Sequence, residues 1–300
     1  RRTRRTRLDR GLMARRKPAT THGVAVVDKP PGVTSHDVVG MLRRRFGARQ
    51  VGHAGTLDPD ATGVLVVAVG KATRLLRFVE KTRKGYTGEI VLGAATSTLD
   101  DSGEVLATFD MSAVTLDDAR RAVAEHLVGD IEQIPPMVSA IRVDGKRLHE
   151  LAREGVEIER APRPVTIHRF DVIDWVEPGV LAIDVECSAG TYIRTLADDL
   201  GRLLGGGAHL RRLRRTHVGE FTIGEAAPPD VCELLPVESA VRALDAVTVD
   251  DDVAALVGNG RVLDAWEGEG PWAVFDRSGT LLAVYEAFRG QAKPAVVLPR

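Results

Sequence analysis

The sequence is poor in cysteine and in long apolar runs, and each shortage excludes a class of protein. Cys187 and Cys232 are its only cysteines, too few for a disulfide framework or a cysteine-based zinc cluster. No apolar run approaches the roughly 18 residues that a membrane-spanning helix needs, and the basic N-terminus is not followed by the apolar stretch of a secretory signal. We therefore expect a protein of the reducing cytoplasm that has no membrane partner.

Charge is nearly balanced over the whole chain but unevenly distributed along it. The 300 residues are 44% hydrophobic and 28% charged, which is typical of about two globular domains. Nine of the 41 basic residues lie within residues 1–17, beside Asp9 alone, so the rest of the chain is acidic. Two later stretches, 41–90 and 201–219, are again rich in Lys and Arg, and they are candidates to follow a phosphate backbone.

The N-terminal segment has no apolar periodicity, which predicts a disordered basic tail over residues 1–22. Two interpretations stay open for it. The tail is either an arm that attracts RNA or an inert extension, translated upstream of a start at Met13. Periodic structure begins only at Gly23.

From Gly23 onward, strands and helices are mixed without the strict alternation of a doubly wound fold. Strands are expected at 24–27, 64–69, 86–92, 141–143, 165–172 and 181–187. Helices are expected from Thr34 or Ser35 to Gly47, from Thr115 to about Gly129, and through Leu196 to Gly205. The Pro-rich, acidic stretch 226–238 is typical of a linker, and short strands are expected after it at 272–275, 281–285 and 295–298. The pattern predicts an α+β fold on a mostly antiparallel sheet, over residues 23–230, with a small β-rich domain over 236–300.

The segment from Gly52 to Pro59, with the sequence Gly-His-Ala-Gly-Thr-Leu-Asp-Pro, is the densest in residues that can do chemistry. Its two glycines and its Asp-Pro predict a tight loop that projects polar side chains from a rigid edge. His53 and Asp58 are the groups in it that can act as acid, base or nucleophile. An Asp-Pro turn alone is more often structural, and a lone histidine is more often packed or solvated, so other segments must support a catalytic role.

Three further segments offer such support. Lys84-Gly85-Tyr86 puts a phenol at the start of a strand, and Tyr192 and Arg194 share a face if their backbone is extended. The glycines from Gly205 lead into an arginine cluster that ends at Arg215, without the Gly-Lys-Ser/Thr of a Walker loop. The eight histidines are scattered, so no metal site is expected.

Taken in order, these segments resemble the bacterial TruB family of tRNA pseudouridine-55 synthases. The resemblance begins at Val24, with Val-Ala-Val-Val-Asp-Lys-Pro-Pro-Gly-Val-Thr-Ser, and includes the Gly-Thr-Leu-Asp-Pro core around Asp58 and the segment from Pro135 to Gly145. It ends near Phe221. It implies a pseudouridine synthase-like catalytic domain over 23–230, and residues 236–300 resemble, more weakly, the PUA-like C-terminal domain of the family.

The resemblance also implies site residues. It places the catalytic groups of the family on Asp58 as nucleophile, on Tyr86, and on Arg194 as the partner of the aspartate. Its substrate contacts fall on His53, Tyr86, Tyr192 and Leu213. The implied reaction is the isomerisation of the uridine at position 55, in the T arm of tRNA, to pseudouridine, with the base flipped out and without a metal or other cofactor.

Isomerisation breaks the C1′–N1 bond and forms a C1′–C5 bond, for which a carboxylate near C1′ either attacks that carbon or removes a sugar proton. The sequence leaves both routes open. Two other classes remain: a non-catalytic RNA-binding protein that uses the same cleft, and a guide-RNA-dependent pseudouridine synthase that works inside a ribonucleoprotein. The intact Asp58, Tyr86 and Arg194 argue against the first, and the acidic C-terminal end argues against the second. We expect a monomer that binds the tRNA T stem-loop without an obligatory protein partner.

Overall fold

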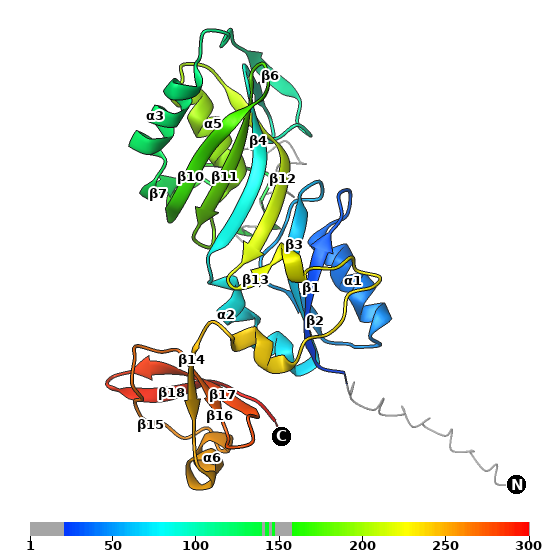
Figure 1. Cartoon of the computed structure of the whole chain (residues 1–300), viewed down its shortest axis with the longest axis vertical. Coiled ribbons are helices and arrows are strands. Elements are labelled where there is room, and N and C mark those ends of the chain that lie inside the picture. Colours follow the sequence, from blue (N-terminus) through cyan, green and yellow to red (C-terminus); the bar gives the residue numbers. More distant parts are fainter. Residues whose placement is uncertain (1–20, 140–141, 144–145, 148–157, 300) are drawn as a thin grey trace, which may run out of the picture.

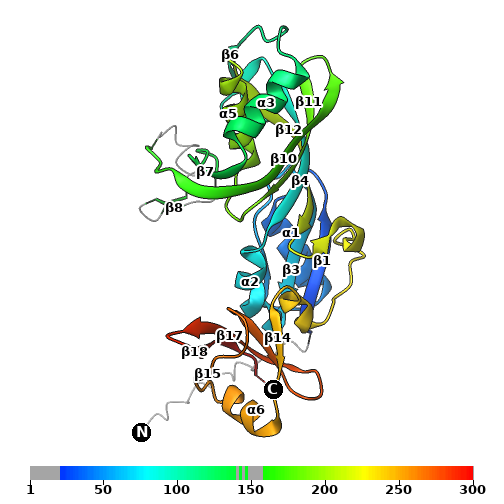
Figure 2. The ribbon, with the colours of Figure 1, turned by 60° about the vertical axis from the view of Figure 1, so that its left-hand side comes forward.

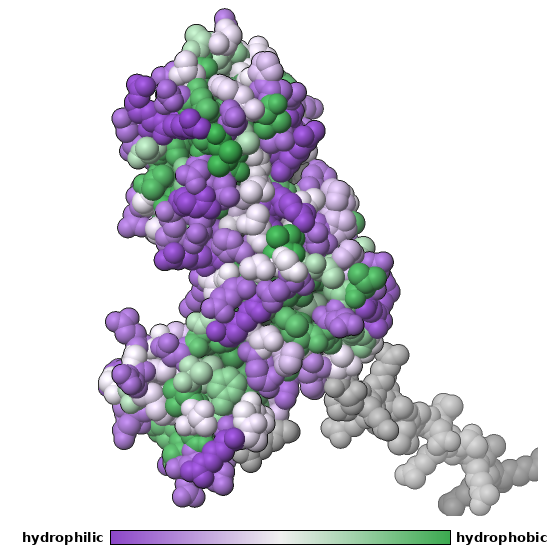
Figure 3. Space-filling view, viewed as in Figure 1, coloured by the Kyte–Doolittle hydropathy of each residue, from purple (hydrophilic) through white to green (hydrophobic). Residues whose placement is uncertain are grey.

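A computed structural model of the chain describes every residue except 1–20, 140–141, 144–145, 148–157 and 300 (Figure 1). The predicted tail over 1–22 therefore lies almost wholly outside the described residues, and the segment from Pro135 to Gly145 lies partly outside them. Two sheets dominate the described part, one of nine strands and one of five. On the face shown in Figure 3, hydrophilic side chains are spread over the whole molecule, with smaller hydrophobic patches between them.

The nine-stranded sheet has the strand order β1-β3-β12-β4-β11-β10-β7, with β2 paired to β3 and β13 paired to β12. Its strands are β1 (Gly23–Lys29), β2 (Val51–His53), β3 (Thr62–Val69), β4 (Lys84–Leu92), β7 (Gly129–Gln133), β10 (Arg163–Glu177), β11 (Val180–Cys187), β12 (Ala208–Val218) and β13 (Phe221–Thr222). Every pairing in it is antiparallel except that of β12 with β3. The predicted α+β class and the mostly antiparallel sheet are thus confirmed.

Two helices begin at N-cap residues that the sequence predicted, Thr115 and one of the two alternatives Thr34 and Ser35, and both N-caps form capping boxes. In α1 (Ser35–Arg45) the Thr34 hydroxyl accepts from the backbone N–H of Asp37, and in α3 (Leu116–His126) Thr115 does the same for Asp118. Helices α3 and α5 (Ile193–Leu203) pack on one face of the sheet around a common apolar core (Figure 2). The helix α2 (Leu76–Glu80) follows the 3₁₀ turn η1 (Gly70–Leu75).

Strands β1 and β3 read as continuous apolar runs because both of their faces are covered. Val27 and Leu65 pack under α1, whereas Val26 and Val66 face the opposite way, into a second apolar cluster. That second cluster also holds Ala273 and other residues of the C-terminal sheet, so the two sheets share part of one core.

The five-stranded C-terminal sheet has the order β14-β16-β17-β18-β15. Its elements are β14 (Asp245–Thr248), α6 (Asp251–Gly258), β15 (Leu263–Asp264), β16 (Trp272–Phe275), β17 (Leu281–Phe288) and β18 (Gln291–Val297). Side chains also connect it to η1 and to the start of α2: Arg74 donates to the Val297 carbonyl at 2.5 Å, and Arg77 pairs with Glu286 at 2.5 Å. The predicted β-rich C-terminal region is therefore confirmed, while its boundary stays a prediction.

Two segments differ from the sequence interpretation. The arginine-rich stretch that ends at Arg215 does follow a turn at the glycines from Gly205, as the sequence predicted, but it forms the strand β12 inside the large sheet. The expected linker at 226–238 is wrong as well, since Ala227 and Leu235 form bridges with β1 and Cys232 is 1% exposed between them. Pro-rich composition concealed this packing, because these contacts join residues that lie far apart in the sequence.

Two small pairs of strands complete the described structure: β5 (Ala94–Thr96) with β6 (Val105–Thr108), and β8 (Arg142–Val143) with β9 (Lys146–Arg147). The predicted strand at 141–143 thus corresponds to β8, and Ile141 lies outside the described residues. No helix in the described part of the chain is long and apolar enough to cross a membrane. The two short 3₁₀ segments η2 (Ile223–Glu225) and η3 (Val237–Val241) connect the sheets.

Candidate active site

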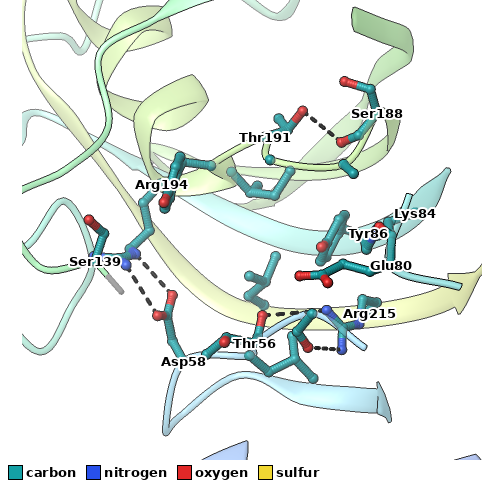
Figure 4. A pocket seen from close by; sticks show the side chains of 17 residues that line it. Thr56, Asp58, Glu80, Lys84, Tyr86, Ser139, Ser188, Thr191, Arg194 and Arg215 are labelled. Carbon is teal, nitrogen blue, oxygen red and sulfur yellow. Dashed lines mark hydrogen bonds and ion pairs between the residues drawn. The ribbon is translucent and has the colours of Figure 1, made fainter. Parts of the chain in front are cut away.

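A cavity of about 270 Å³ opens between β4, β12 and the loop that follows β2 (Figure 4). Its lining includes Asp58, Tyr86, Tyr192, Arg194 and Leu213, which are five of the six residues that the sequence assigned to the site. The sixth, His53, does not line it. The structure therefore brings together residues from four separate segments, although their roles stay predictions.

Asp58 and Arg194 form a two-pronged ion pair at one side of the cavity. Arg194 Nε lies 3.0 Å from Asp58 Oδ2, and Arg194 Nη2 donates to Asp58 Oδ1 at 3.1 Å. The guanidinium also donates to the carbonyls of Thr98 and Val138, each at 2.9 Å. The Arg194 side chain is 5% exposed whereas that of Asp58 is 40% exposed, because the carboxylate faces the cavity. Such a geometry fixes the carboxylate in one orientation.

Opposing effects act on the pKa of Asp58. Burial raises this pKa above its ordinary value and is the largest cause, while the charge of Arg194 lowers it. A second carboxylate, Asp100, lies 3.6 Å from Arg194 Nε and adds to the rise. The net result is a carboxyl group with a raised pKa that still has a cation beside it.

Asp100 was missed by the sequence interpretation. Its Oδ1 accepts from the Thr98 hydroxyl at 2.6 Å and from the Ser102 N–H at 3.1 Å, which is the pattern of an ordinary turn residue. The preceding Leu99 has a φ of 63°, in the left-handed region. A non-glycine residue in this region marks a strained turn, which is often found at a functional site. The strain is visible only in the structure, so the sequence gave no reason to select Asp100.

The loop that carries Asp58 is held by side chains on both sides of that residue. The Ser35 hydroxyl accepts from the Leu57 N–H at 2.9 Å and donates to the Leu57 carbonyl at 3.1 Å. Lys29 Nζ donates to the Pro59 carbonyl at 2.7 Å and also to the carbonyls of Pro30 and Val33. Because Lys29 is fully buried, its pKa is lowered to about 8. Both anchors come from the start of the chain, where the sequence offered only a resemblance.

Arg215 holds the same loop from the opposite side. Its Nη2 donates to the Gly55 carbonyl at 3.1 Å and its Nε donates to the Val64 carbonyl at 2.7 Å. The side chain is 1% exposed, so the expectation that it follows a phosphate backbone is wrong. Gly63 lies so close to Arg215 that a Cβ there would stand 2.2 Å from the Arg215 carbonyl oxygen. Only glycine allows β3 and β12 to approach in this way.

The remaining arginines of β12 are also engaged within the protein. Arg211 lies 2.7 Å from Glu89 and 2.8 Å from Glu177, and Arg214 lies 2.9 Å from Asp28. Arg212, which pairs with Glu89 at 3.1 Å, is the most exposed of them, at 70%. The charge of this stretch is therefore largely neutralised by carboxylates, which the sequence did not predict.

The two tyrosines reach the cavity from different elements. Tyr86 lies on β4 and is 7% exposed, and burial raises its pKa although the nearby Arg215 opposes the rise. Tyr192 precedes α5, and its N–H and carbonyl are both bound by the Gln133 side chain, at 2.9 and 3.2 Å. Helix α5 begins at Ile193, so Arg194 is helical and the shared face in extended backbone is wrong. Both side chains nevertheless line the cavity.

His53 lies at the end of β2, directly before the loop, and pairs with Val67 of β3. Burial lowers its pKa, and its Nδ1 is buried without a hydrogen-bond partner among the described atoms. The predicted substrate contact of His53 thus stays a prediction. Within the residues that the structure describes, no group of three or more His, Cys, Asp or Glu side chains is arranged to hold a metal ion.

Comparisons with known proteins match the chain along nearly its whole length. The family model for "TruB family pseudouridylate synthase (N terminal domain)" matches residues 43–193. The models "tRNA pseudouridylate synthase B C-terminal domain" and "tRNA Pseudouridine synthase II, C terminal" match 194–240 and 244–299.

Similar proteins carry the same description. The tRNA pseudouridine synthase B of Arthrobacter sp. (strain FB24) is 47% identical, over 92% of this chain and 96% of its own. That of Symbiobacterium thermophilum is 50% identical, over 79% of this chain and 82% of its own. Among solved structures, a chain of a Cbf5-Nop10-Gar1 complex has a TM-score of 0.70 and 26% identity, over 93% of this chain and 84% of that one.

Proposed function

The chain belongs to the TruB family of pseudouridine synthases, and from this premise we propose that it isomerises the uridine at position 55 of tRNA, in the T arm, to pseudouridine. The observation that carries the proposal is the pair of Asp58 with Arg194 at the side of a cavity that Tyr86 also lines. A carboxylate that is fixed by a buried arginine and yet exposed to a cavity is suited to act on a sugar carbon.

Asp58 acts in its ionised form on both possible routes. Either the carboxylate attacks C1′ of the ribose, or it removes a sugar proton, and in both cases the base leaves with the electron pair of the C1′–N1 bond. Burial disfavours the ionised form, and Arg194 opposes this effect. The ion pair therefore keeps a reactive carboxylate available in a partly buried site.

The detached base then turns and C5 bonds to C1′. On the first route the bond between Asp58 and C1′ breaks in this step, and on the second route Asp58 returns its proton to the sugar. The proton on C5 then leaves, and N1 takes up a proton. Tyr86 offers a ring that can stack on uracil and a hydroxyl oxygen near the reacting base. Because burial raises the pKa of Tyr86, the phenol starts neutral. If Tyr86 removes the proton from C5, it therefore acts as a proton relay: its hydroxyl oxygen accepts the C5 proton while its own proton passes to another acceptor.

The target base must leave its stack to enter the cavity. We propose that His53, directly before the Asp58 loop, fills the vacated position. The lowered pKa of His53 supports this role, because it favours a neutral ring that can lie among bases. Recognition of a folded T arm relies on its shape and phosphates. The exposed Arg43, Arg44 and Arg49 near the end of α1 supply positive charge for such contacts.

The alternative is a synthase that works inside a ribonucleoprotein. The similarity to a chain solved with Nop10 and Gar1 favours it, whereas the higher identity to proteins named tRNA pseudouridine synthase B favours an enzyme that acts on tRNA directly. One experiment separates the two. The purified chain alone, incubated with an unmodified tRNA transcript, should form pseudouridine at position 55, mapped along the transcript.

A transcript with cytidine at that position serves as the matched control and should stay unmodified. An isolated T stem-loop should also be a substrate, because the proposal places recognition in that arm. Product only after addition of a guide RNA or partner proteins would contradict direct action on tRNA. Product at another uridine would contradict the assigned position but leave the reaction intact.

A further inference from the structure

The wall of the cavity that faces Asp58 and Arg194 carries positive charge that the reaction described above does not use (Figure 4). Lys84 and Arg215 both line it, and they are 5% and 1% exposed. In the described part of the chain, no carboxylate lies within ion-pair distance, 4.0 Å, of either side chain. A buried cation without a counter-ion is costly, and at the wall of a cavity it indicates that the counter-ion arrives with the ligand.

The hydrogen bonds of the two cations distinguish their roles. The Arg215 guanidinium donates to backbone carbonyls and holds the Asp58 loop, as described above. Lys84 Nζ donates to the carbonyls of Glu80 and Thr82, at 2.7 and 3.0 Å. An ammonium group has three protons, so Lys84 keeps one that no described protein atom accepts.

Lys84 is also well placed relative to the base. It lies two residues before Tyr86 on β4, so both side chains project from the same face of the strand. Its stem passes beside the Asp58 loop, where a Cβ on Gly55 would stand 3.3 Å from Lys84 Cε. A uracil that stacks on Tyr86, with its ribose at Asp58, therefore extends toward the Lys84 side of the cavity.

The chemistry supplies the missing anion. When the C1′–N1 bond breaks, both of its electrons stay on uracil, whose negative charge spreads from N1 to the O2 and O4 oxygens. This charge exists only until C5 bonds to C1′. A cation beside the base thus stabilises the detached state more than the bound uridine, which is the condition for a contribution to rate.

Building on the proposed function, we propose that Lys84 is a further catalytic residue, whose ammonium group binds the detached uracil and stabilises its negative charge until the C1′–C5 bond has formed. Lys84 neither gains nor loses a proton in this step. Its role does not depend on which route Asp58 takes, because the base leaves as an anion on both.

The surroundings of Lys84 keep it charged near neutral pH. Burial lowers its pKa to about 8, the charge of Arg215 on β12 lowers it as well, and Cys187 on β11 and Glu80 on α2 oppose them. Burial raises the pKa of Cys187 to about 11, so that thiol is neutral. Glu80 lines the same cavity but is exposed. An arriving anion favours the ammonium form further.

The test compares three variants in single-turnover pseudouridine formation and in tRNA binding. Lys84→Met removes the charge at nearly constant length and should slow the reaction about 100-fold, as expected for one stabilising donor, with the Kd for tRNA nearly unchanged. Lys84→Arg keeps the charge and should recover much of the rate.

The control is Lys81→Met, at an exposed lysine outside the cavity. Its rate and its affinity for tRNA should equal those of the parent. Lys84→Gln keeps a donor without the charge and replaces the Met variant should that variant not fold.

A pH profile separates this role from mere support of the α2 end. The parent rate should fall as pH rises through about 8, because Lys84 then loses its proton, and the Lys84→Arg variant should lose this alkaline limb. Lys29 also has a pKa of about 8, so the alkaline limb is assigned to Lys84 only if the Lys84→Arg variant loses it. A limb that persists in this variant contradicts the role of Lys84.

If Lys84→Met has the same rate and the same affinity for tRNA as the parent, Lys84 has no catalytic role. The proposed function would stand in that case. A rate loss that Lys84→Arg does not recover, together with a lower Tm, would show that the side chain only supports the fold. A parent protein that forms no pseudouridine would overturn the proposed function, and the role of Lys84 with it.

Discussion

The two sheets of this molecule are both mostly antiparallel, yet they differ in where they hold buried charge. In the described structure, every charged residue that is buried belongs to the large sheet or to the segments packed on it: Lys29, Lys84, Arg194, Asp198 and Arg215. The described residues of the C-terminal sheet bury Trp272 and Tyr285 among aliphatic side chains. The Trp272 indole N–H and the Tyr285 hydroxyl both donate to backbone carbonyls, at 2.8 and 2.9 Å.

Burial of charge weakens a fold unless each charge is well paired. Four of these five charged side chains contact the Asp58 loop or line the cavity, and none serves the C-terminal sheet. The difference indicates that the large sheet retains its buried charges for the chemistry. The C-terminal sheet, with a core of ordinary composition, contributes stability and a fixed surface.

Substitution of Asp58 tests this interpretation with the largest expected effect. Asp58→Asn keeps the shape of the side chain but removes the anion, so pseudouridine formation should fall roughly 10⁴-fold or more. Affinity for tRNA should be retained or slightly improved, because a negative charge near the RNA is lost. Single-turnover rates and binding curves measure both quantities, and turnover within tenfold of the parent would exclude Asp58 as the reactive group.

Substitution of Arg194 should cause the second-largest loss of activity. Arg194→Ala should slow the reaction about 100-fold or more, because the carboxylate loses the group that orients it and favours its ionised form. It should lower the stability by less than the loss of one partner of a fully buried pair, which costs about 3 kcal/mol or more, because Asp58 is 40% exposed. The rate should fall as pH drops through the raised pKa of Asp58, and this acid limb should move to higher pH in Arg194→Ala, because the group that favours the carboxylate is gone.

Arg194→Lys is the matched variant. It keeps the charge without the planar fork, so it should restore the acid limb better than the rate. An alanine variant with the acid limb of the parent would show that Arg194 does not set the pKa of Asp58, and would leave the arginine only the role of holding the carboxylate in position.

Tyr86 should have a smaller effect. Tyr86→Phe keeps the ring for stacking and deletes the hydroxyl, so a role in proton relay at C5 predicts a loss of about 10- to 100-fold in rate with little change in affinity. Equal losses of rate and affinity, measured on the same tRNA, would point to a binding role only.

The sequence predicted most accurately those features that depend on neighbours in the chain. The starts of α1 and α3 follow from capping boxes within four residues, Thr34 with Asp37 and Thr115 with Asp118. The positions of Asp58 and Arg194 came from a resemblance, and the structure places them in one ion pair. Their catalytic roles stay predictions.

What the sequence did not predict depends on contacts between distant residues. The arginines of β12 were candidates to follow a phosphate backbone because the sequence does not show their acidic partners. The partners of Arg211 and Arg214, Glu89 and Asp28, come from other strands. The same holds for Asp100, whose local hydrogen bonds are those of a turn and whose functional neighbour is Arg194. Composition cannot reveal pairs that only the folded sheet brings together.

Substitutions in the C-terminal sheet should have the smallest effects on turnover. Two adjacent residues of β17 provide a matched pair of variants. Leu281 and Leu282 are 3% and 4% exposed, on opposite faces of the strand. Leu281 packs in the cluster that also holds Phe78 of α2, whereas Leu282 packs in the core on the α6 side. Each change to Ala should lower the free energy of unfolding by about 2–5 kcal/mol, measured by denaturant titration.

Their effects on turnover should differ. No residue of this sheet lines the cavity among those described, but α2 carries Glu80, whose carbonyl binds Lys84. Leu281→Ala therefore loosens the support of one cavity wall and should reduce the rate, whereas Leu282→Ala should leave turnover unchanged at temperatures where the protein stays folded. Equal turnover in both variants would show that the C-terminal sheet stabilises the fold without supporting the site, because the shared core would then not transmit a change to the end of α2.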